Sequence, residues 1–184
     1  SSWIMLGAEG DLDGQAGDFA GGGVALSSDG TIVAVGAYTH DSDKGTVRVY
    51  QWNGTSWIKL GTEEDLDGQA GDYAGGSVAL SSDGTILAVG ADNHNNGTNT
   101  NEGTTRVYQW NGSSWIMLGT EGELDGQVRD FAGGGVALSG DGTIVAVGAY
   151  YHESGKGTVR IYKWNGSSWI MLGAEGDLDG QAGD

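Results

Sequence analysis

The sequence repeats itself, and this repetition limits the possible fold more than any other feature. The motif Ser-Trp-Ile-Met-Leu-Gly begins at Ser2 and returns, with one change at most, at Ser56, Ser114 and Ser168. Its tryptophans lie 54, 58 and 54 residues apart. The extra residues of the middle unit fall in the asparagine-rich stretch 93–102, which we expect to be a loop because insertions in repeats map to loops.

Each unit has the pattern of four short strands joined by tight turns. In the first unit, residues 24–27 and 31–37 are apolar and flank the turn signal Asp29-Gly30. Residues 45–52 alternate between apolar and polar side chains, and Asn53-Gly54 marks a hairpin before residues 56–60. Glycine interrupts every window with a helical period. We therefore predict an almost helix-free, all-β, β-propeller-like array of four-stranded antiparallel blades at about residues 24–60, 78–118 and 136–172.

The two ends of the sequence are identical to each other. Residues 1–18 and 167–184 both read Ser-Ser-Trp through Gly-Asp, so the chain holds three full units and a third of a fourth. We divide it into an N-terminal outer strand and linker (1–18), three blades (19–64, 65–122 and 123–176) and the start of the next linker (177–184).

Composition narrows the class of partner. The net charge of −17 argues against binding to nucleic acid or to anionic membranes. No apolar run approaches the roughly 20 residues that span a bilayer, so we expect no membrane insertion. The chain has no cysteine and therefore no disulfide framework. We expect a protein of the extracellular space or the cell surface.

The glycine-rich strand pattern resembles the FG-GAP repeat of integrin-α-type β-propellers. Phe19-Ala-Gly-Gly-Gly-Val-Ala-Leu is followed by Asp29-Gly-Thr-Ile-Val-Ala-Val-Gly-Ala, and both segments return in phase from Tyr73 and from Phe131. The resemblance covers essentially the whole chain, which is also similar to tandem repeats in surface proteins of marine microalgae. It implies a β-propeller built from repeated blades.

The sequence departs from the FG-GAP pattern at the calcium loop. The family often carries Asp-x-Asn-x-Asp-Gly between the first two strands, whereas this chain has Ser-Ser-Asp-Gly at residues 27–30. One carboxylate in a tight turn cannot supply the roughly six to eight oxygens that calcium prefers. A proline that usually follows Gly-Ala in the family is replaced by Tyr38, Asp92 and Tyr150.

The acidic linkers between blades are the strongest candidates for a metal site. Asp11-Leu-Asp13-Gly, followed by Asp18, can wrap a hard cation with carboxylates and backbone carbonyls. Turn chemistry explains the same spacing, and we favour it because the EF-hand spacing is not met. If calcium binds, its candidate ligands are Asp11, Asp13, Asp18, Asp65, Asp67, Asp72, Glu123, Asp125 and Asp130.

The sequence shows no constellation of catalytic residues. Each unit has one histidine, at His40, His94 and His152, and we interpret these as solvated loop side chains because a ring of blades keeps them apart. The sequence has no Gly-x-Ser-x-Gly elbow and no glycine-rich loop that opens a helix. Repetition itself disfavours the asymmetric constellation of an active site, so we predict that the protein is not an enzyme.

Four asparagine sequons are glycosylation candidates, at Asn53, Asn96, Asn111 and Asn165. All except Asn96, which lies in the long loop, are also hairpin turn residues. Pairs of tryptophans flank the hairpin turns, at Trp52/Trp57, Trp110/Trp115 and Trp164/Trp169. Such pairs can stack on sugars, but we favour packing across the hairpin.

Near-identical acidic repeats favour a structural or adhesive extracellular protein that assembles head to tail with copies of itself. Three blades do not close a ring, since propellers use about four to eight, and residues 2–6 are a fourth-strand copy without a blade of their own. We expect that copy to pair with a neighbouring chain, in a filament or a multi-chain propeller. The alternative is a ligand-binding propeller that recognises glycans or surface proteins through its loops, with or without calcium.

Overall fold

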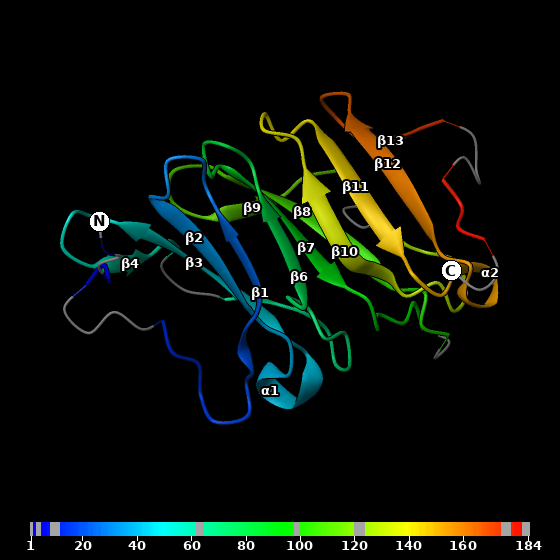
Figure 1. Ribbon diagram of the computed structural model, residues 1–184, viewed down its shortest axis with the longest axis horizontal. Helices are drawn as coiled ribbons and strands as arrows, with labels where there is room; N and C mark the ends of the chain where they lie inside the picture. The colour runs from blue at the N-terminus through cyan, green and yellow to red at the C-terminus, as the bar shows by residue number, and fades with distance from the viewer. Residues whose placement is uncertain are drawn as a thin grey trace.

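Three four-stranded sheets stand side by side in the computed structural model, which describes residues 2, 5–7, 12–61, 65–97, 100–119, 124–173 and 178–181 (Figure 1). All neighbouring strands in them are antiparallel. The first sheet contains β1 (Ala20–Leu26), β2 (Ile32–Ala37), β3 (Thr46–Trp52) and β4 (Trp57–Lys59), the second β6 (Ser77–Leu80), β7 (Ile86–Ala91), β8 (Thr104–Trp110) and β9 (Trp115–Met117), and the third β10 (Ala132–Leu138), β11 (Ile144–Ala149), β12 (Thr158–Trp164) and β13 (Trp169–Leu172). The prediction of an all-β array of antiparallel blades is confirmed.

Helix is almost absent from the described residues, as predicted. The two helical segments, α1 (His40–Asp43) and α2 (His152–Gly155), have four residues each. Both contain left-handed backbone, with φ of 47° at Asp41 and 46° at Glu153, so they are turns more than helices.

The first strand of each sheet begins in a glycine run that carries no β-propensity of its own. Our prediction started this strand at residue 24, but β1 begins at Ala20. Ala20 pairs with Ala37, and the register then shifts before Gly23 pairs with Gly36, which marks a bulge. Gly21 has φ of 91°, a conformation that the bulge requires and that glycine adopts freely.

The Asp-Gly turns hold their shape through the aspartate side chain. Asp29 Oδ1 accepts hydrogen bonds from Ser27 Oγ at 2.7 Å and from the Thr31 backbone N–H at 2.9 Å. The same bonds form around Asp83 and Asp141. Hydrogen bonds from Ser139 and Thr143 lower the pKa of Asp141 to about 2. These three carboxylates therefore stabilise the turns in which they lie.

The core lies between the sheets in two clusters. The first joins Val47 and Val49 of β3 to Leu87 and Val89 of β7. The second joins Val107 of β8 to residues of β11, including Val145 and Val147. Each cluster is therefore shared by successive sheets, and the middle sheet contributes to both.

The linker after the first blade stays attached to the first sheet. Its short strand β5 (Leu66–Asp67) pairs with β3, between Leu66 and Val47. In the next linker, Leu124 exchanges backbone hydrogen bonds with Thr105 of β8. Our division assigned both linkers to the following blade, whereas their backbone bonds run to the preceding one.

Candidate functional site

A buried aspartate, a histidine and an arginine form one cluster in every unit. In the middle unit, His94 Nδ1 lies 2.8 Å from Asp72 Oδ1, and Arg106 Nη1 donates to Asp72 Oδ2 at 2.9 Å. The third unit repeats the arrangement with Asp130, His152 and Arg160, and the first with Asp18, His40 and Arg48. The interpretation of the histidines as solvated loop side chains is wrong for His94, which is buried. His40 and His152 are also largely covered.

Hydrogen bonds keep the buried aspartates ionised. Burial alone raises the pKa of Asp72, but bonds from His94 and the Gln69 backbone N–H, together with the Arg106 charge, hold the pKa below its ordinary value. The pKa of Asp130 is lowered in the same way. The sequence carries a signal for these pairs, because aspartate and histidine are 22 residues apart in each unit.

The candidate calcium ligands divide into several groups. Asp18, Asp72 and Asp130 hold histidine and arginine partners, and Asp65 pairs with Arg48 and Lys59. Asp13, Asp67 and Asp125 are exposed, while Asp11 and Glu123 lie outside the described residues. Among the described residues, two of the candidates, Asp65 and Asp67, lie together with His40 in a group whose ligand atoms are within 4.8 Å of one another. Calcium binding stays a prediction.

The Asp–His contact of each unit joins two loops, and each loop presents one further residue. The residue after the aspartate is Phe19, Tyr73 or Phe131, and each has a left-handed φ of 48°, 53° or 51°. The residue directly after β2, β7 or β11 is Tyr38, Asp92 or Tyr150. Left-handed backbone at a non-glycine residue costs free energy and often occurs at functional sites.

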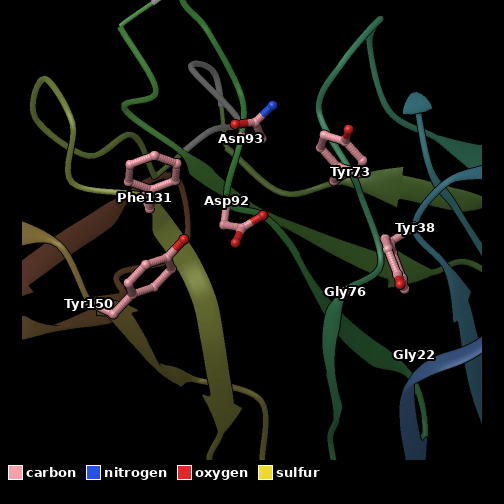
Figure 2. Close-up of a pocket in the computed structure, with 8 residues that line it drawn as sticks. All are labelled: Gly22, Tyr38, Tyr73, Gly76, Asp92, Asn93, Phe131 and Tyr150. Atoms are coloured by element: carbon pink, nitrogen blue, oxygen red, sulfur yellow. The ribbon is translucent and has the colours of Figure 1, made fainter. Parts of the chain in front are cut away.

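Five of these six residues, all except Phe19, line one pocket of about 380 Å³, so each of the three units contributes to it. Figure 2 shows Asp92 between the pair Tyr38 and Tyr73 on one side and the pair Phe131 and Tyr150 on the other. The ring centroids lie 6.3 Å apart in the first pair and 5.4 Å apart in the second. Pockets for small ligands begin at about 300 Å³ and are largely aromatic or apolar, with few polar groups.

Glycine allows two of the tyrosine rings to lie against the backbone of the first strand of their own sheet, β1 or β10. A Cβ at Gly22 would lie 2.7 Å from Cδ1 of Tyr38, and one at Gly134 would lie 2.8 Å from Cδ1 of Tyr150. A larger residue at either position would displace the ring. The glycine run at the start of the first strand thus shapes the flanks of this pocket.

The half-buried Asp92 differs electrostatically from the buried carboxylates of the clusters. Burial raises the pKa of Asp92, and no described residue with a cationic side chain pairs with it. Burial raises the pKa of Tyr150, and the negative charge of Asp92 raises it further. The side-chain amide of the neighbouring Asn93 is already engaged, because its Nδ2 donates to the Gly71 carbonyl and its Oδ1 accepts from Asn101.

The sequon asparagines and tryptophan pairs lie away from this pocket. Asn53 Oδ1 accepts bonds from the backbone N–H groups of Thr55 and Ser56, and Asn111 and Asn165 do the same in their turns. Asn96 is exposed, and glycosylation stays a prediction at all four asparagines. The tryptophans of each hairpin pack on each other, with ring centroids 5.4 to 5.5 Å apart.

The fold resembles those of solved proteins, whereas no protein-family model and no curated protein matches the sequence. A structure from Bacteroides uniformis ATCC 8492, provisionally named a 6-phosphogluconolactonase, matches 82% of this chain and 39% of its own, with 11% identity and a TM-score of 0.55. TolB from Acinetobacter baumannii matches 85% of this chain and 32% of its own, with 15% identity and a TM-score of 0.46. The chain thus spans 39% of the length of the first of these proteins and 32% of the second.

The first of these comparisons corrects one prediction. We reasoned that repetition disfavours an active site, yet a repeated-blade structure similar to this one bears an enzyme's name. The prediction that the protein is not an enzyme therefore no longer stands.

No helix in the described ranges is long and apolar enough to cross a membrane. The structural likeness concerns the fold alone, and that fold is of the β-propeller type.

Proposed function

We propose that the chain is a ligand-binding propeller module whose pocket takes a ligand with an alkylammonium group. The observation that carries the proposal is Asp92, a partly buried carboxylate among four aromatic rings with no cationic partner in the described part of the chain. A cationic ligand would neutralise this carboxylate and receive cation–π attraction from the ring faces. The net charge of −17 further favours cations over anions.

A neutral sugar fits the pocket less well. Sugar recognition needs several hydrogen-bonding groups directed at hydroxyls, but the amide of Asn93 is already engaged. The phenol of Tyr73 is also engaged, since the charge of Asp43 and a hydrogen bond from the phenol to its carboxylate raise the pKa of Tyr73. Asp92 and the remaining tyrosine hydroxyls therefore provide most of the available polarity.

Choline and its neutral isostere, in which carbon replaces nitrogen, test the proposal by calorimetry. We expect choline to bind and the isostere to bind roughly tenfold more weakly, because desolvated cation–π and ionic contacts contribute on the order of 1–2 kcal/mol. Asp92→Asn should remove the preference for choline. Asp125→Asn, which removes one exposed charge elsewhere, should leave the affinity for choline unchanged.

Three results would contradict the proposal. Choline and its isostere would bind equally, Asp92→Asn would bind choline as the wild type does, or no choline would bind at millimolar concentration. A neutral sugar whose affinity is indifferent to Asp92→Asn would instead favour the glycan alternative.

The wider assignment also remains a proposal. We infer an FG-GAP-like surface protein, extracellular and similar to the microalgal repeats, in which the pocket contributes to adhesion. Its support is that the FG-GAP-like segments form the first two strands of every sheet and flank the pocket. Detection of glycans at Asn96 in protein secreted by a eukaryotic host would support the extracellular assignment.

A further inference from the structure

The same seven residues, Ala-Gly-Gly-Gly-Val-Ala-Leu, form β1 and β10, but their surroundings differ. In β10, Val136 and Leu138 pack on the core cluster shared with the second sheet. In β1, Val24 and Leu26 are 59% and 58% exposed. The strand that joins the third sheet to the second thus has an identical, uncovered copy at the outer face of the first sheet.

Backbone hydrogen bonds define the joint between successive sheets. At the first joint, the Tyr73 N–H donates to the Asp43 carbonyl and the Ala74 N–H to the Lys44 carbonyl, both at 3.0 Å. The second joint repeats these bonds from Phe131 to Asn101 and from Ala132 to Glu102, at 3.1 and 3.0 Å. A third bond runs in the opposite direction in both joints, from Ser28 to Ser82 and from Ser82 to Gly140, at 2.8 Å each.

A glycine in the second strand of each sheet lets the next sheet approach. A Cβ at Gly36 would lie 1.9 Å from the carbonyl oxygen of Gly75, and one at Gly90 would lie 2.0 Å from that of Gly133. At the equivalent Gly148, the nearest atom is 3.4 Å away, on Gly135 of the same sheet. The third sheet therefore has the same groove at Gly148, but no described strand of a following sheet lies in it.

The groove on the third sheet is open and lined mostly by apolar residues. It has a volume of about 460 Å³ and is lined by Gly148, Val159 and Leu178 among others. Val159 is 41% exposed, whereas Val47, its equivalent in the first sheet, is 1% exposed. Gly180, in the described part of the linker, donates to the Gly157 carbonyl as Gly126 does to Gly103.

We propose that this groove binds the β1 edge of a second copy of the chain, head to tail. By analogy with the internal joints, Phe19 and Ala20 of the second copy donate to the carbonyls of Gly155 and Lys156, and Gly140 donates to Ser28 of the second copy. This joint uses β1, whereas our sequence prediction placed the exchange at residues 2–6, of which Trp3 and Ile4 lie outside the described residues.

The contact joins different faces of the two copies, so repeated contacts produce either a closed ring or an open filament. Two copies bring together six blades, within the range of about four to eight that closed propellers use. A rotation that closes yields a two-chain ring, and one that does not yields a filament. This inference is independent of the ligand that we propose for the pocket.

Sedimentation velocity of the full chain and two variants tests the joint. Gly148→Ala adds a Cβ that its own sheet tolerates but that would collide with an incoming strand. Val24→Lys puts a charge on the opposite edge. We expect the wild type to assemble, each variant alone to be monomeric, and their equimolar mixture to form dimers, because the mixture retains one intact edge and one intact groove.

Ile58→Lys is the matched control, since Ile58 is also an exposed aliphatic residue, at 50% against 59% for Val24, but lies on β4 at the opposite edge of the sheet. It should assemble as the wild type does, and circular dichroism should show every variant folded. A wild type that is monomeric at high micromolar concentration would overturn the proposal. So would variants that assemble like the wild type, or a mixture that stays monomeric.

Discussion

The second and third units contain the same aspartate–histidine–arginine cluster in different surroundings. The histidine–aspartate distance is 2.8 Å in both, and the arginine–aspartate distances are 2.9 and 2.7 Å. The side chain of Arg106 is 6% exposed, however, and that of Arg160 is 13% exposed. The local sequence thus builds the cluster, and the adjoining sheet decides how deeply it is buried.

Within the middle unit, the buried Asp72 and the half-buried Asp92 have different surroundings. Asp72 has a histidine and an arginine as partners and a lowered pKa, which suits a structural role. Asp92 has no cationic partner in the described ranges and a raised pKa, which suits binding. Natural sequences tolerate such an unfavourable group where it has a function.

The largest effect should come from removing the arginine of the middle cluster. Arg106→Met leaves Asp72 as an uncompensated buried charge, a change that typically costs about 3–5 kcal/mol. Arg160→Met should cost less, because the Arg160 side chain is 13% exposed and that of Arg106 6%, so water can replace the lost guanidinium more readily in the third unit. Urea unfolding measures both, and equal losses would break the comparison between the two units.

The glycines at the joints should give the next largest difference. Gly90→Ala drives a Cβ into the backbone of Gly133, and overpacking of this kind costs about 1–3 kcal/mol. Gly148→Ala should be neutral or slightly stabilising when the protein is dilute enough to be monomeric. A loss as large for Gly148→Ala as for Gly90→Ala would show that the third groove is not open.

Acid should destabilise the protein through the cluster aspartates. The pKa values of Asp18, Asp72 and Asp130 are lowered in the folded state, so their contribution is complete above about pH 4 and is lost as the pH falls through the folded values. Asp72→Asn should flatten the fall in unfolding free energy below pH 4 more than Asp13→Asn, which changes an exposed carboxylate. Equal slopes would contradict this account.

Local patterns in the sequence predicted most of the strands. The expected strand at 31–37 is β2, 45–52 is β3 and 56–60 is β4, to within two residues at either end, because turn residues and alternation bound them. The beginning of β1 was missed since its pairing depends on a glycine bulge, which local propensity does not reveal. The linker strand β5 was missed as well, because its partner is a distant strand.

The pocket was harder to predict because its residues come from three units. The sequence does contain a signal for the pocket. At the equivalent positions Tyr38, Asp92 and Tyr150, only the middle unit has a charged residue. Without the topology, nothing shows that these positions converge. The histidines were wrongly interpreted as solvated for the same reason, since the aspartate partner of each lies 22 residues upstream on another loop.

The most direct test of the account is a carbon-detected NMR titration of the Asp92 carboxyl group, with and without choline. We predict that its pKa lies above the ordinary value of about 3.9 in the free protein and falls when choline binds, since a cation favours the charged form. The Asp72 carboxyl should titrate below that value and remain unaffected. An ordinary Asp92 pKa that choline does not move would contradict the assignment of this pocket.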